Sequence, residues 1–464
     1  MNARQNRLRI STLIRKQREF FCSSATRSLD FRTRQLRLLE SLLRNQEEAL
    51  LAALFADLRK PRFEAILGEL SLIHREIALA IRMLPHWSAR RRVKTNLVNF
   101  PSRSYLLAEP FGVSYIAGAW NYPLQLSLLP LVSSMAAGNT AVVKPSELAP
   151  RSSRAMAAMI NENFPEEYLR VVEGGADVAG SILKEKFDKI FFTGGGAIGK
   201  IVYEAAARQM TPVTLELGGK NPAIVLRDCN LPVTAKRLVW GKYFNAGQSC
   251  VAPDYVLVHS SVERELLSHM KNLLDRHYPS DGTRETTAIV NRKHFDRLRS
   301  MIPREKVYCG GTWDKRSLSI RPTLLHNVSF ADDVMKEEIF GPVLPVIRYD
   351  TLGEAVEAVR RYDRPLSLYV YGKKSAATDR LFSELSFGGG SLNDSVMYFV
   401  NHHLPYGGVG GSGIGGYHGW EGFRAFSHDK AILEKGTWLE PWFLKTPPYR
   451  EWKVRLMRTL LEWP

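Results

Sequence analysis

Two residues of this chain form a pair that could make and then break an acyl bond, Glu216 and Cys250. Glu216 lies between two leucines just before the Gly218-Gly219 turn, and Cys250 follows later in a loop of small and polar residues. A thiolate can attack a carbonyl carbon, and a separate carboxylate can activate the water that hydrolyses the resulting thioester. The pair therefore predicts acyl chemistry, provided that the fold brings the two side chains together.

Each member of the pair also has a simpler explanation. Glu216 could be a structural carboxylate that caps its glycine turn, although its leucine neighbours predict partial burial and the raised pKa of a general base. Most cysteines are inert small hydrophobes, and the other three in this chain give no reason to think otherwise. No adjacent His or Lys lowers the pKa of Cys250, so a helix start or a bound cofactor would have to activate it.

A run of three glycines, Gly194 to Gly196, follows a strand-like segment that ends at Thr193, and Gly199 comes shortly after. A strand, a glycine turn and a helix start would place backbone N–H groups against a pyrophosphate. The spacing is not GxGxxG and no Walker-type Gly-Lys-Ser/Thr follows, so a plain tight turn is an alternative.

Two further polar residues follow predicted strands. Glu147 could accept hydrogen bonds from a ribose, or could interact with the positive end of the dipole of the helix that starts there. Asn121, after Trp120, could offer its amide to an oxyanion, although on its own it would pass as a turn residue.

Strands and helices alternate through the segments that carry these residues. We predict strands at 113–118, 140–144, 190–193, 223–226, 255–258, 343–347 and 368–371, with helices ending near 137, 160, 210, 276 and 301. This alternation is typical of parallel sheets with helices on both faces.

The remaining segments have different patterns. Leucines at helical spacing between Leu36 and Phe55 predict core-facing helices, and a further helix is expected from Glu64 to a stop at Pro85. Residues 92–107 predict a hairpin that either projects to a partner subunit or lies on its own domain. The glycine-rich stretch 407–416 is expected to be irregular backbone wrapped close to another segment, not the interior of an element.

Composition excludes several classes of protein. A chain of 464 residues should form two or three packed units. Its four scattered cysteines lack a CxxC pair, which argues against a disulfide framework and a metal site and favours the cytoplasm. The formal net charge is +17, but without a zinc-finger or RNP-type motif we expect solvated surface charge and no nucleic-acid binding. No apolar run is long enough to span a bilayer.

Both ends of the chain are basic. The Arg-rich start resembles a transit peptide, but helical apolar spacing begins by about Ile10, so a basic first helix is preferred. The end from Tyr449 predicts a basic amphipathic helix with one apolar stripe, made of Trp452, Leu456, Leu460 and Trp463. Such a helix can contact a membrane surface peripherally, or dock onto its own or a neighbouring subunit, which we favour.

Six motifs occur in the order in which the aldehyde dehydrogenase superfamily carries them, and the chain resembles that family from about residue 10 to 435. The motifs are Trp120-Asn121-Tyr122-Pro123, Lys144-Pro145-Ser146-Glu147, Thr193 to Gly199, Leu215 to Lys220, Gly247-Gln248-Ser249-Cys250 and Glu337 to Pro342. The segments 251–255, 404–408 and 417–419 look like the class 3-type branch, which includes fatty and aromatic aldehyde dehydrogenases.

The resemblance implies an α/β fold with two doubly wound parallel-sheet domains and a small β oligomerisation arm. Residues 1–88 and 109–215 would form the NAD(P)-binding domain and 216–405 the catalytic domain. Residues 89–108 and 406–435 would be oligomerisation or bridging segments, and 436–464 a C-terminal tail with an amphipathic helix. A homodimer is expected.

It also implies roles for individual residues. Cys250 would attack an aldehyde, Asn121 and the Cys250 N–H would hold the oxyanion, hydride would pass to a nicotinamide, and Glu216 would activate the hydrolytic water. The implied cofactor contacts are Lys144, Glu147, Thr193, Gly194, Gly195, Gly196, Gly199, Glu338 and Phe340. NAD is expected because Glu147 repels a 2′-phosphate, although this branch often accepts NADP too.

The sequence departs from the family where Gly194 to Gly196 replace the usual Ser or Thr. The substrate is expected to be a medium- or long-chain aliphatic or an aromatic aldehyde, with pocket walls from 121–126 and 398–406. Two alternatives stay open. One is a CoA-acylating enzyme, which Glu216 argues against, and the other is a non-catalytic protein on the same fold.

Overall fold

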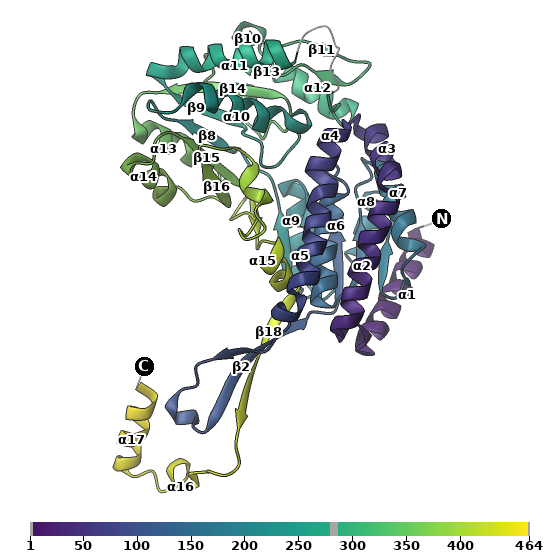
Figure 1. Cartoon of the computed structure of the whole chain (residues 1–464), viewed down its shortest axis with the longest axis vertical. Coiled ribbons are helices and arrows are strands. Elements are labelled where there is room, and N and C mark those ends of the chain that lie inside the picture. Colours follow the sequence, from purple (N-terminus) through teal and green to yellow (C-terminus); the bar gives the residue numbers. More distant parts are fainter. Residues whose placement is uncertain (1–2, 279–285, 463–464) are drawn as a thin grey trace.

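The computed structural model describes residues 3–278 and 286–462, which form two α/β parts and a long arm (Figure 1). The two parts are built around a six-stranded and a seven-stranded sheet, and the arm contains a three-stranded antiparallel sheet. The predicted fold class, two wound parallel sheets with a small β arm, is therefore confirmed.

The first sheet has the strand order β17-β7-β6-β3-β4-β5. Its strands are β3 (Val113–Ala117), β4 (Thr140–Lys144), β5 (Leu169–Val171), β6 (Lys189–Thr193), β7 (Val213–Glu216) and β17 (Gly413–Ile414). The first five strands run parallel, and β17 pairs antiparallel with the end of β7. The carboxyl ends of β3, β4, β6 and β7 consequently meet at one edge, where the residues that follow them can form a site.

Helices cover both faces of this sheet because successive strand side chains point in opposite directions. Val113 and Tyr115 of β3 pack with α1 (Ala3–Cys22), α8 (Ala176–Ile182) and α9 (Gly196–Ala207). Ile116 packs on the other face, into the larger core cluster. The helices of that cluster include α2 (Leu29–Asn45), α3 (Glu47–Leu58), α5 (Ser71–Trp87), α6 (Gln125–Ala137), α7 (Pro150–Asn161) and α15 (Gly419–Ala425).

The second sheet has the order β10-β13-β14-β9-β8-β15-β16, and only the edge strand β10 is antiparallel to its neighbour. Its strands are β8 (Pro222–Val225), β9 (Tyr255–His259), β10 (Val307–Cys309), β13 (Thr323–Leu325), β14 (Val343–Tyr349), β15 (Ser367–Tyr371) and β16 (Gly389–Leu392). Its helices are α10 (Leu231–Tyr243), α11 (Glu263–His277), α12 (Arg292–Ser300), α13 (Leu352–Arg360) and α14 (Ala376–Glu384). A separate two-stranded ribbon pairs β11 (Trp313–Asp314) with β12 (Ser319–Ile320).

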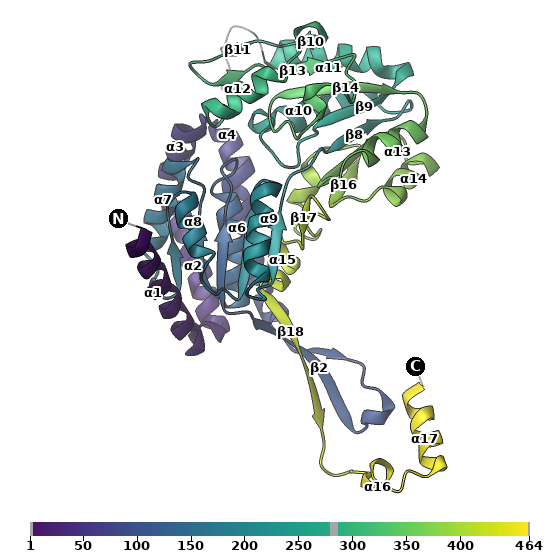
Figure 2. The ribbon, with the colours of Figure 1, turned by 180° about the vertical axis from the view of Figure 1, so that it is seen from behind.

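The predicted hairpin is present and, together with β18, forms the length of the arm (Figure 1). Strand β1 (Arg91–Val93) pairs with β2 (Ser102–Pro110), and β2 pairs along its whole length with β18 (Ser427–Lys435). The arm carries α16 (Trp442–Lys445) and α17 (Glu451–Glu462) away from both sheets, as Figure 2 also shows from behind. Helix α17 confirms the expected C-terminal helix, although Trp463 of its expected stripe lies outside the described residues.

Two predictions about local structure were wrong. The helix expected to stop at Pro85 continues to Trp87, because a proline so near the helix end removes one hydrogen bond and has little helix left to distort. Within the glycine-rich stretch, Gly413 and Ile414 form strand β17, which pairs with β7. Only glycine allows so close an approach, because a Cβ at position 413 would lie 2.3 Å from the Leu215 carbonyl oxygen. Close wrapping of this stretch against another segment is nevertheless confirmed.

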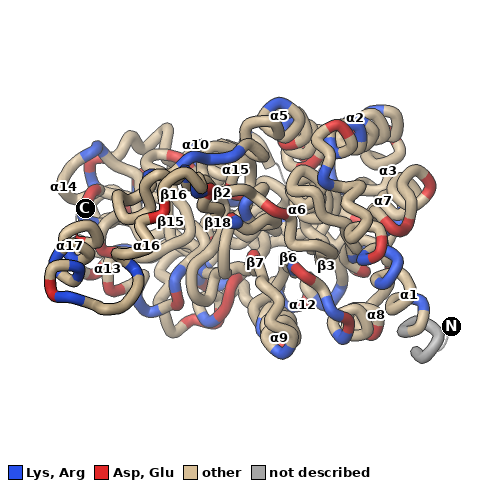
Figure 3. The backbone as a smooth tube through the Cα atoms, turned by 90° about the horizontal axis from the view of Figure 1, so that it is seen from below, with Lys and Arg blue, Asp and Glu red and all other residues tan. Residues whose placement is uncertain are grey.

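Lys and Arg are spread over many elements of the described chain and interspersed with Asp and Glu (Figure 3), as expected for solvated surface charge. Among the described residues, no helix combines the length and the apolar character needed to cross a membrane.

Candidate active site

One cavity of about 810 Å³ runs along the carboxyl edge of the first sheet and reaches both members of the predicted catalytic pair. Its lining includes these predicted site residues: Asn121, Lys144, Glu147, Thr193, Gly194, Gly195, Glu216, Cys250, Glu338 and Phe340. Gly199 does not line it but packs beneath, where an added Cβ would lie 2.6 Å from the Leu217 side chain. The fold thus brings together residues that are far apart in the sequence, since Asn121 and Phe340 are separated by 219 positions.

Glu216 is the last residue of β7 and pairs in register with Thr193, the last residue of β6. Its side chain is almost completely buried, and neither carboxyl oxygen has a hydrogen-bond partner among the described residues. Burial therefore raises the pKa of Glu216 well above its usual value. An unpaired carboxyl group facing a cavity is free to bond a water molecule or a substrate.

Cys250 lies in the loop that follows α10, and its backbone path is tightly constrained. Asn245 and Ala246 adopt left-handed conformations, and an added Cβ at Gly247 would lie 2.3 Å from the Gly341 carbonyl oxygen. The Cys250 Sγ lies 3.1 Å from the Tyr406 hydroxyl oxygen. Burial raises the pKa of the Cys250 thiol to about 12, and the hydrogen bond with Tyr406 acts in the opposite direction.

Asn121 follows β3 and is also buried. Its Nδ2 donates a hydrogen bond to the Gln248 carbonyl oxygen at 3.1 Å, two residues before Cys250. A side-chain amide has two N–H donors, so this bond leaves the second one for a ligand in the cavity.

The glycine turn offers room for a large anionic group. An added Cβ at Gly195 or Gly196 would meet nothing within 4 Å, whereas one at Gly194 would lie 2.6 Å from the Phe192 ring. Helix α9 starts at Gly196 without a side-chain cap, so the N–H groups that begin its first turn are available to an anion. The buried Thr193 hydroxyl also lacks a hydrogen-bond partner among the described residues.

Two further places along the cavity carry polar groups that suit riboses. Lys144 Nζ donates to Glu147 at 3.0 Å beside the glycine turn. Glu338 packs against the Gly218 turn, and burial raises the pKa of its carboxyl group to about 8. These donors, acceptors and the open glycine turn fit a dinucleotide such as NAD(P).

Sequence reasoning missed the residues that hold Glu338 and Phe340. Arg297 of α12 donates to the Glu338 carbonyl oxygen at 3.2 Å and to the Ile339 carbonyl oxygen at 2.7 Å. His294 packs on Trp120, which in turn makes an edge contact with the Phe340 ring. A helix was predicted there, but the partners of its side chains are more than 40 residues away and leave no local signal.

A second, narrower cavity of about 250 Å³ also reaches Cys250, and Leu126 and Cys250 line both. The predicted walls contribute Tyr122, Gln125, Leu126, Phe399, Val400 and Tyr406. Side chains that the sequence did not indicate come from α5 and the turn before it, and from α10 and the residue after it: Leu67, Leu72, Arg75, Trp240 and Phe244. Cys250 therefore lies between a cavity that carries several charged and polar side chains and a narrower one with almost wholly apolar walls.

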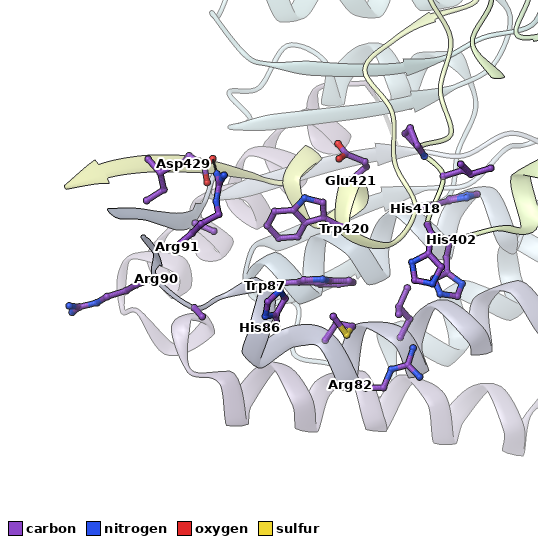
Figure 4. A pocket seen from close by; sticks show the side chains of 18 residues that line it. Arg82, His86, Trp87, Arg90, Arg91, His402, His418, Trp420, Glu421 and Asp429 are labelled. Atoms are coloured by element: carbon purple, nitrogen blue, oxygen red, sulfur yellow. Dashed lines mark hydrogen bonds and ion pairs between the residues drawn. The ribbon is translucent and has the colours of Figure 1, made fainter. Parts of the chain in front are cut away.

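A third cavity of about 680 Å³ lies at the root of the arm, between α5, α15 and β18 (Figure 4). Trp87 and Trp420 form one wall, and Arg91 pairs with Asp429 at 2.7 Å on another. Neither Cys250 nor Glu216 lines it. It is therefore separate from the candidate active site.

Comparison with known proteins gives matches along nearly the whole chain. A model described as the aldehyde dehydrogenase family matches residues 3–432. The chain is 42% identical over 435 residues to the 4,4'-diaponeurosporen-aldehyde dehydrogenase of Staphylococcus aureus, covering 93% of this chain and 95% of that protein. It is 39% identical over 427 residues to the dimeric NADP-preferring aldehyde dehydrogenase of Canis lupus familiaris, covering 92% and 94%. The substrate-bound structure of Staphylococcus aureus AldH superposes with a TM-score of 0.95 at 40% identity, covering 98% and 99%.

Proposed function

The chain belongs to the class 3-type branch of the NAD(P)-dependent aldehyde dehydrogenase family, and on that premise we propose that it oxidises apolar aldehydes to carboxylic acids with Cys250 as the nucleophile. One observation carries the proposal. Cys250 and the buried Glu216, whose carboxyl group has no hydrogen-bond partner in the described part of the chain, line the same cavity, which also reaches the open glycine turn. Nucleophile, base and cofactor site therefore share one space.

In the proposed reaction the Cys250 thiolate bonds to the aldehyde carbon. The negative charge on the oxygen is stabilised by the free N–H of the Asn121 amide and by the Cys250 backbone N–H. When bound, NAD(P) supplies the hydride acceptor. Once this carbon has given up its hydride, Cys250 would hold it as an acyl-thioester. Glu216 then takes a proton from the water that attacks this thioester, which releases the acid and the thiol.

The residues proposed to hold the cofactor divide along the cavity. Lys144 and Glu147 would contact the adenosine ribose, and the N–H groups at the start of α9 with Thr193 would contact the pyrophosphate. Glu338 and Phe340 would hold the nicotinamide ribose.

The narrow cavity supports an apolar substrate. Its walls are mostly aromatic and aliphatic, and Arg75 is the one charged side chain among the described residues that line it. Medium- or long-chain aliphatic aldehydes and aromatic aldehydes suit such walls, because each buried methylene group contributes about 0.8 kcal/mol.

A substrate panel tests the function. NAD reduction should be followed with aldehydes of increasing chain length and with benzaldehyde-type substrates, and the product should be identified. We expect kcat/KM to rise with chain length and the product to be the free acid. Absence of NAD reduction across the panel would overturn the proposal, and formation of acyl-CoA without free acid would show that coenzyme A resolves the thioester.

Tyr406 should tune the nucleophile. Because its hydroxyl group hydrogen-bonds to Cys250 Sγ, replacing it by phenylalanine removes a contact that favours the thiolate. The pKa of Cys250 should then rise further, because the hydroxyl group no longer stabilises the thiolate. Iodoacetamide alkylation of Cys250, measured against pH, should be about 10-fold slower at a given pH in Tyr406→Phe. Equal rates in both proteins would contradict this role for the hydroxyl.

Glu147 should set the preference between NAD and NADP. In Glu147→Gln the repulsion of a 2′-phosphate disappears, and Lys144 loses its carboxylate partner and becomes available to the phosphate. Since Glu147 is half-exposed, we expect a moderate rise of about 10-fold, or 1.4 kcal/mol, in the ratio of kcat/KM for NADP to that for NAD. An unchanged ratio would place the 2′-position away from Glu147.

The arm supports a homodimer. The outer end of the arm exposes several large apolar side chains, namely Leu97, Phe100, Trp438, Trp442 and Phe443. Such surface is usually covered by a partner. Sedimentation should give a dimer for the native chain and a monomer for the Trp438→Ser/Trp442→Ser variant. A variant that stays dimeric but no longer floats with anionic vesicles would assign the segment to membrane contact instead.

A further inference from the structure

A short stretch before α5 carries buried charges that the proposed reaction does not use. Lys60 and Glu69 are both completely buried and form an ion pair with 2.6 Å between Lys60 Nζ and Glu69 Oε1. Glu64, between them, accepts a hydrogen bond from the Thr287 hydroxyl at 2.6 Å. Lysine and glutamate are almost never fully buried unless they are paired. The other groups that these buried charges contact therefore indicate their role.

The ion pair holds the loop that contains Asn121. Lys60 Nζ donates to the Asn121 carbonyl oxygen at 2.8 Å. The second carboxyl oxygen of Glu69 accepts from the backbone N–H of Leu124 at 2.8 Å and of Gln125 at 3.3 Å. Lys60 therefore fixes the start of the loop, and Glu69 fixes its end at the first turn of α6.

The backbone shape of this stretch makes these contacts possible. Helix α4 (Arg62–Ala65) passes through one π-helical segment, Ile66–Leu70, before α5 begins. The wider turn lets Gly68 approach the Tyr122 ring so closely that an added Cβ would lie 2.9 Å from it. This backbone shape places the Glu69 carboxyl group at the N-terminal end of α6. Single π-turns inside helices are frequent near functional sites.

The same stretch also holds the Cys250 loop. Glu64 accepts from the Asn245 backbone N–H at 3.2 Å. The Asn245 side-chain amide donates both to the Asn121 carbonyl oxygen at 3.1 Å and to the Gln248 carbonyl oxygen at 3.0 Å. The two loops that would form the oxyanion site are thus tied to each other and to residues 60–69.

Stability alone does not account for the ion pair. Removing two charges from water costs several kcal/mol per ion, and apolar replacements of buried pairs are often neutral or stabilising. We propose that Lys60 and Glu69 are positioning residues, which fix the Asn121 loop so that the free N–H of its side-chain amide points at the oxygen of an aldehyde bound to Cys250. This proposal rests on the proposed function of Asn121.

A double-mutant cycle tests it. The variant Lys60→Met/Glu69→Gln removes both charges, while the new glutamine side chain keeps an acceptor for the Leu124 N–H. It should be made alone and combined with Asn121→Ala. We expect Asn121→Ala to lower kcat about 100-fold, as for other oxyanion donors. The paired variant should lower kcat about 10- to 100-fold with unchanged KM for NAD, but less than about 3-fold further when Asn121 is already replaced by alanine.

A second buried ion pair provides the matched control. Lys220 and Asp254 are also buried, with 2.5 Å between Lys220 Nζ and Asp254 Oδ2, but they hold the backbone near Glu337 and Ile339 instead. The losses of kcat from Lys220→Met/Asp254→Asn and Asn121→Ala should therefore multiply. Thermal unfolding and NAD binding show that each variant is folded. If the paired variant does not fold, the single isosteric substitution Glu69→Gln replaces it, and its loss of kcat is again compared with and without Asn121→Ala.

The outcomes separate the two proposals. If Asn121→Ala retains full activity, the oxyanion role is wrong and the positioning role fails with it. If Asn121→Ala is impaired but the Lys60→Met/Glu69→Gln variant causes the same fold-loss in both backgrounds, the oxyanion role stands and the pair is merely structural. A non-additive loss, together with multiplying losses for the control pair, supports the positioning role.

Discussion

Cys250→Ala is expected to abolish NAD reduction, with kcat falling at least about 10⁴-fold, because removal of a catalytic nucleophile leaves only binding and electrostatic stabilisation. The substitution removes one sulfur atom from a half-buried position and adds no polar group, so the fold should be retained. Stopped-flow absorbance at 340 nm should show neither a burst nor a steady state. NAD binding should be nearly unchanged, because the proposed dinucleotide contacts lie along the rest of the cavity.

A second cysteine of similar exposure gives the control. Cys229 is also half-buried and has a raised pKa, but it lines neither cavity that reaches Cys250. Cys229→Ala should keep the activity of the native enzyme. Substantial turnover by Cys250→Ala would refute the nucleophile assignment, whereas loss of activity in both variants would indicate damage to the fold.

The strands that position the site could be predicted because they are buried on both faces. Val113–Ala117, Thr140–Lys144 and Lys189–Thr193 are short, almost wholly apolar runs that end in turn residues, and each matches its predicted range to within one residue. Such runs have few alternatives once Gly or Pro marks their ends. Their parallel order then places the residues that follow each strand at one edge, which is why a local pattern could indicate a shared site.

Long-range contacts could not be predicted in the same way. The hydrogen bond between Cys250 and Tyr406 joins residues 156 positions apart, and nothing near either residue indicates the other. Lys60 and Glu69 could not be predicted for the same reason, because in the sequence Lys60 beside Pro61 and Glu69 beside Gly68 resemble ordinary solvated charges. Only the packing of α6 against the π-turn shows that both are buried.

The same limit applies to exposure. The leucine neighbours of Glu216 predict partial burial, but the side chain is buried almost completely and has no partner for either oxygen among the described residues. The nearly complete burial raises the pKa of Glu216 more than partial burial would, because desolvation without a compensating hydrogen-bond donor destabilises the charged carboxylate. The direction of the pKa shift was therefore predictable, and the complete burial without a hydrogen-bond partner among the described residues was not.

Glu216→Gln should separate the two halves of the reaction. Glutamine fills the same volume but cannot accept a proton from water, so the acyl group should form on Cys250 and then remain there. We expect a burst of about one NADH per active site, followed by a steady state about 10²- to 10⁴-fold slower than that of the native enzyme, the usual range for loss of a general base. Quenched-flow mass spectrometry should detect the acylated chain.

The pH dependence of the steady state gives an independent check, because burial raises the pKa of Glu216 well above its usual value. Below that raised pKa the carboxyl group is protonated and cannot act as a base, so deacylation by the native enzyme should become faster as pH rises through it. Glu216→Gln has no such group, and its slow deacylation should follow only the hydroxide concentration. If the variant kept the native pH profile and an undiminished steady state, another residue would have to be the base. The unpaired carboxyl group of Glu216 would then need a different explanation.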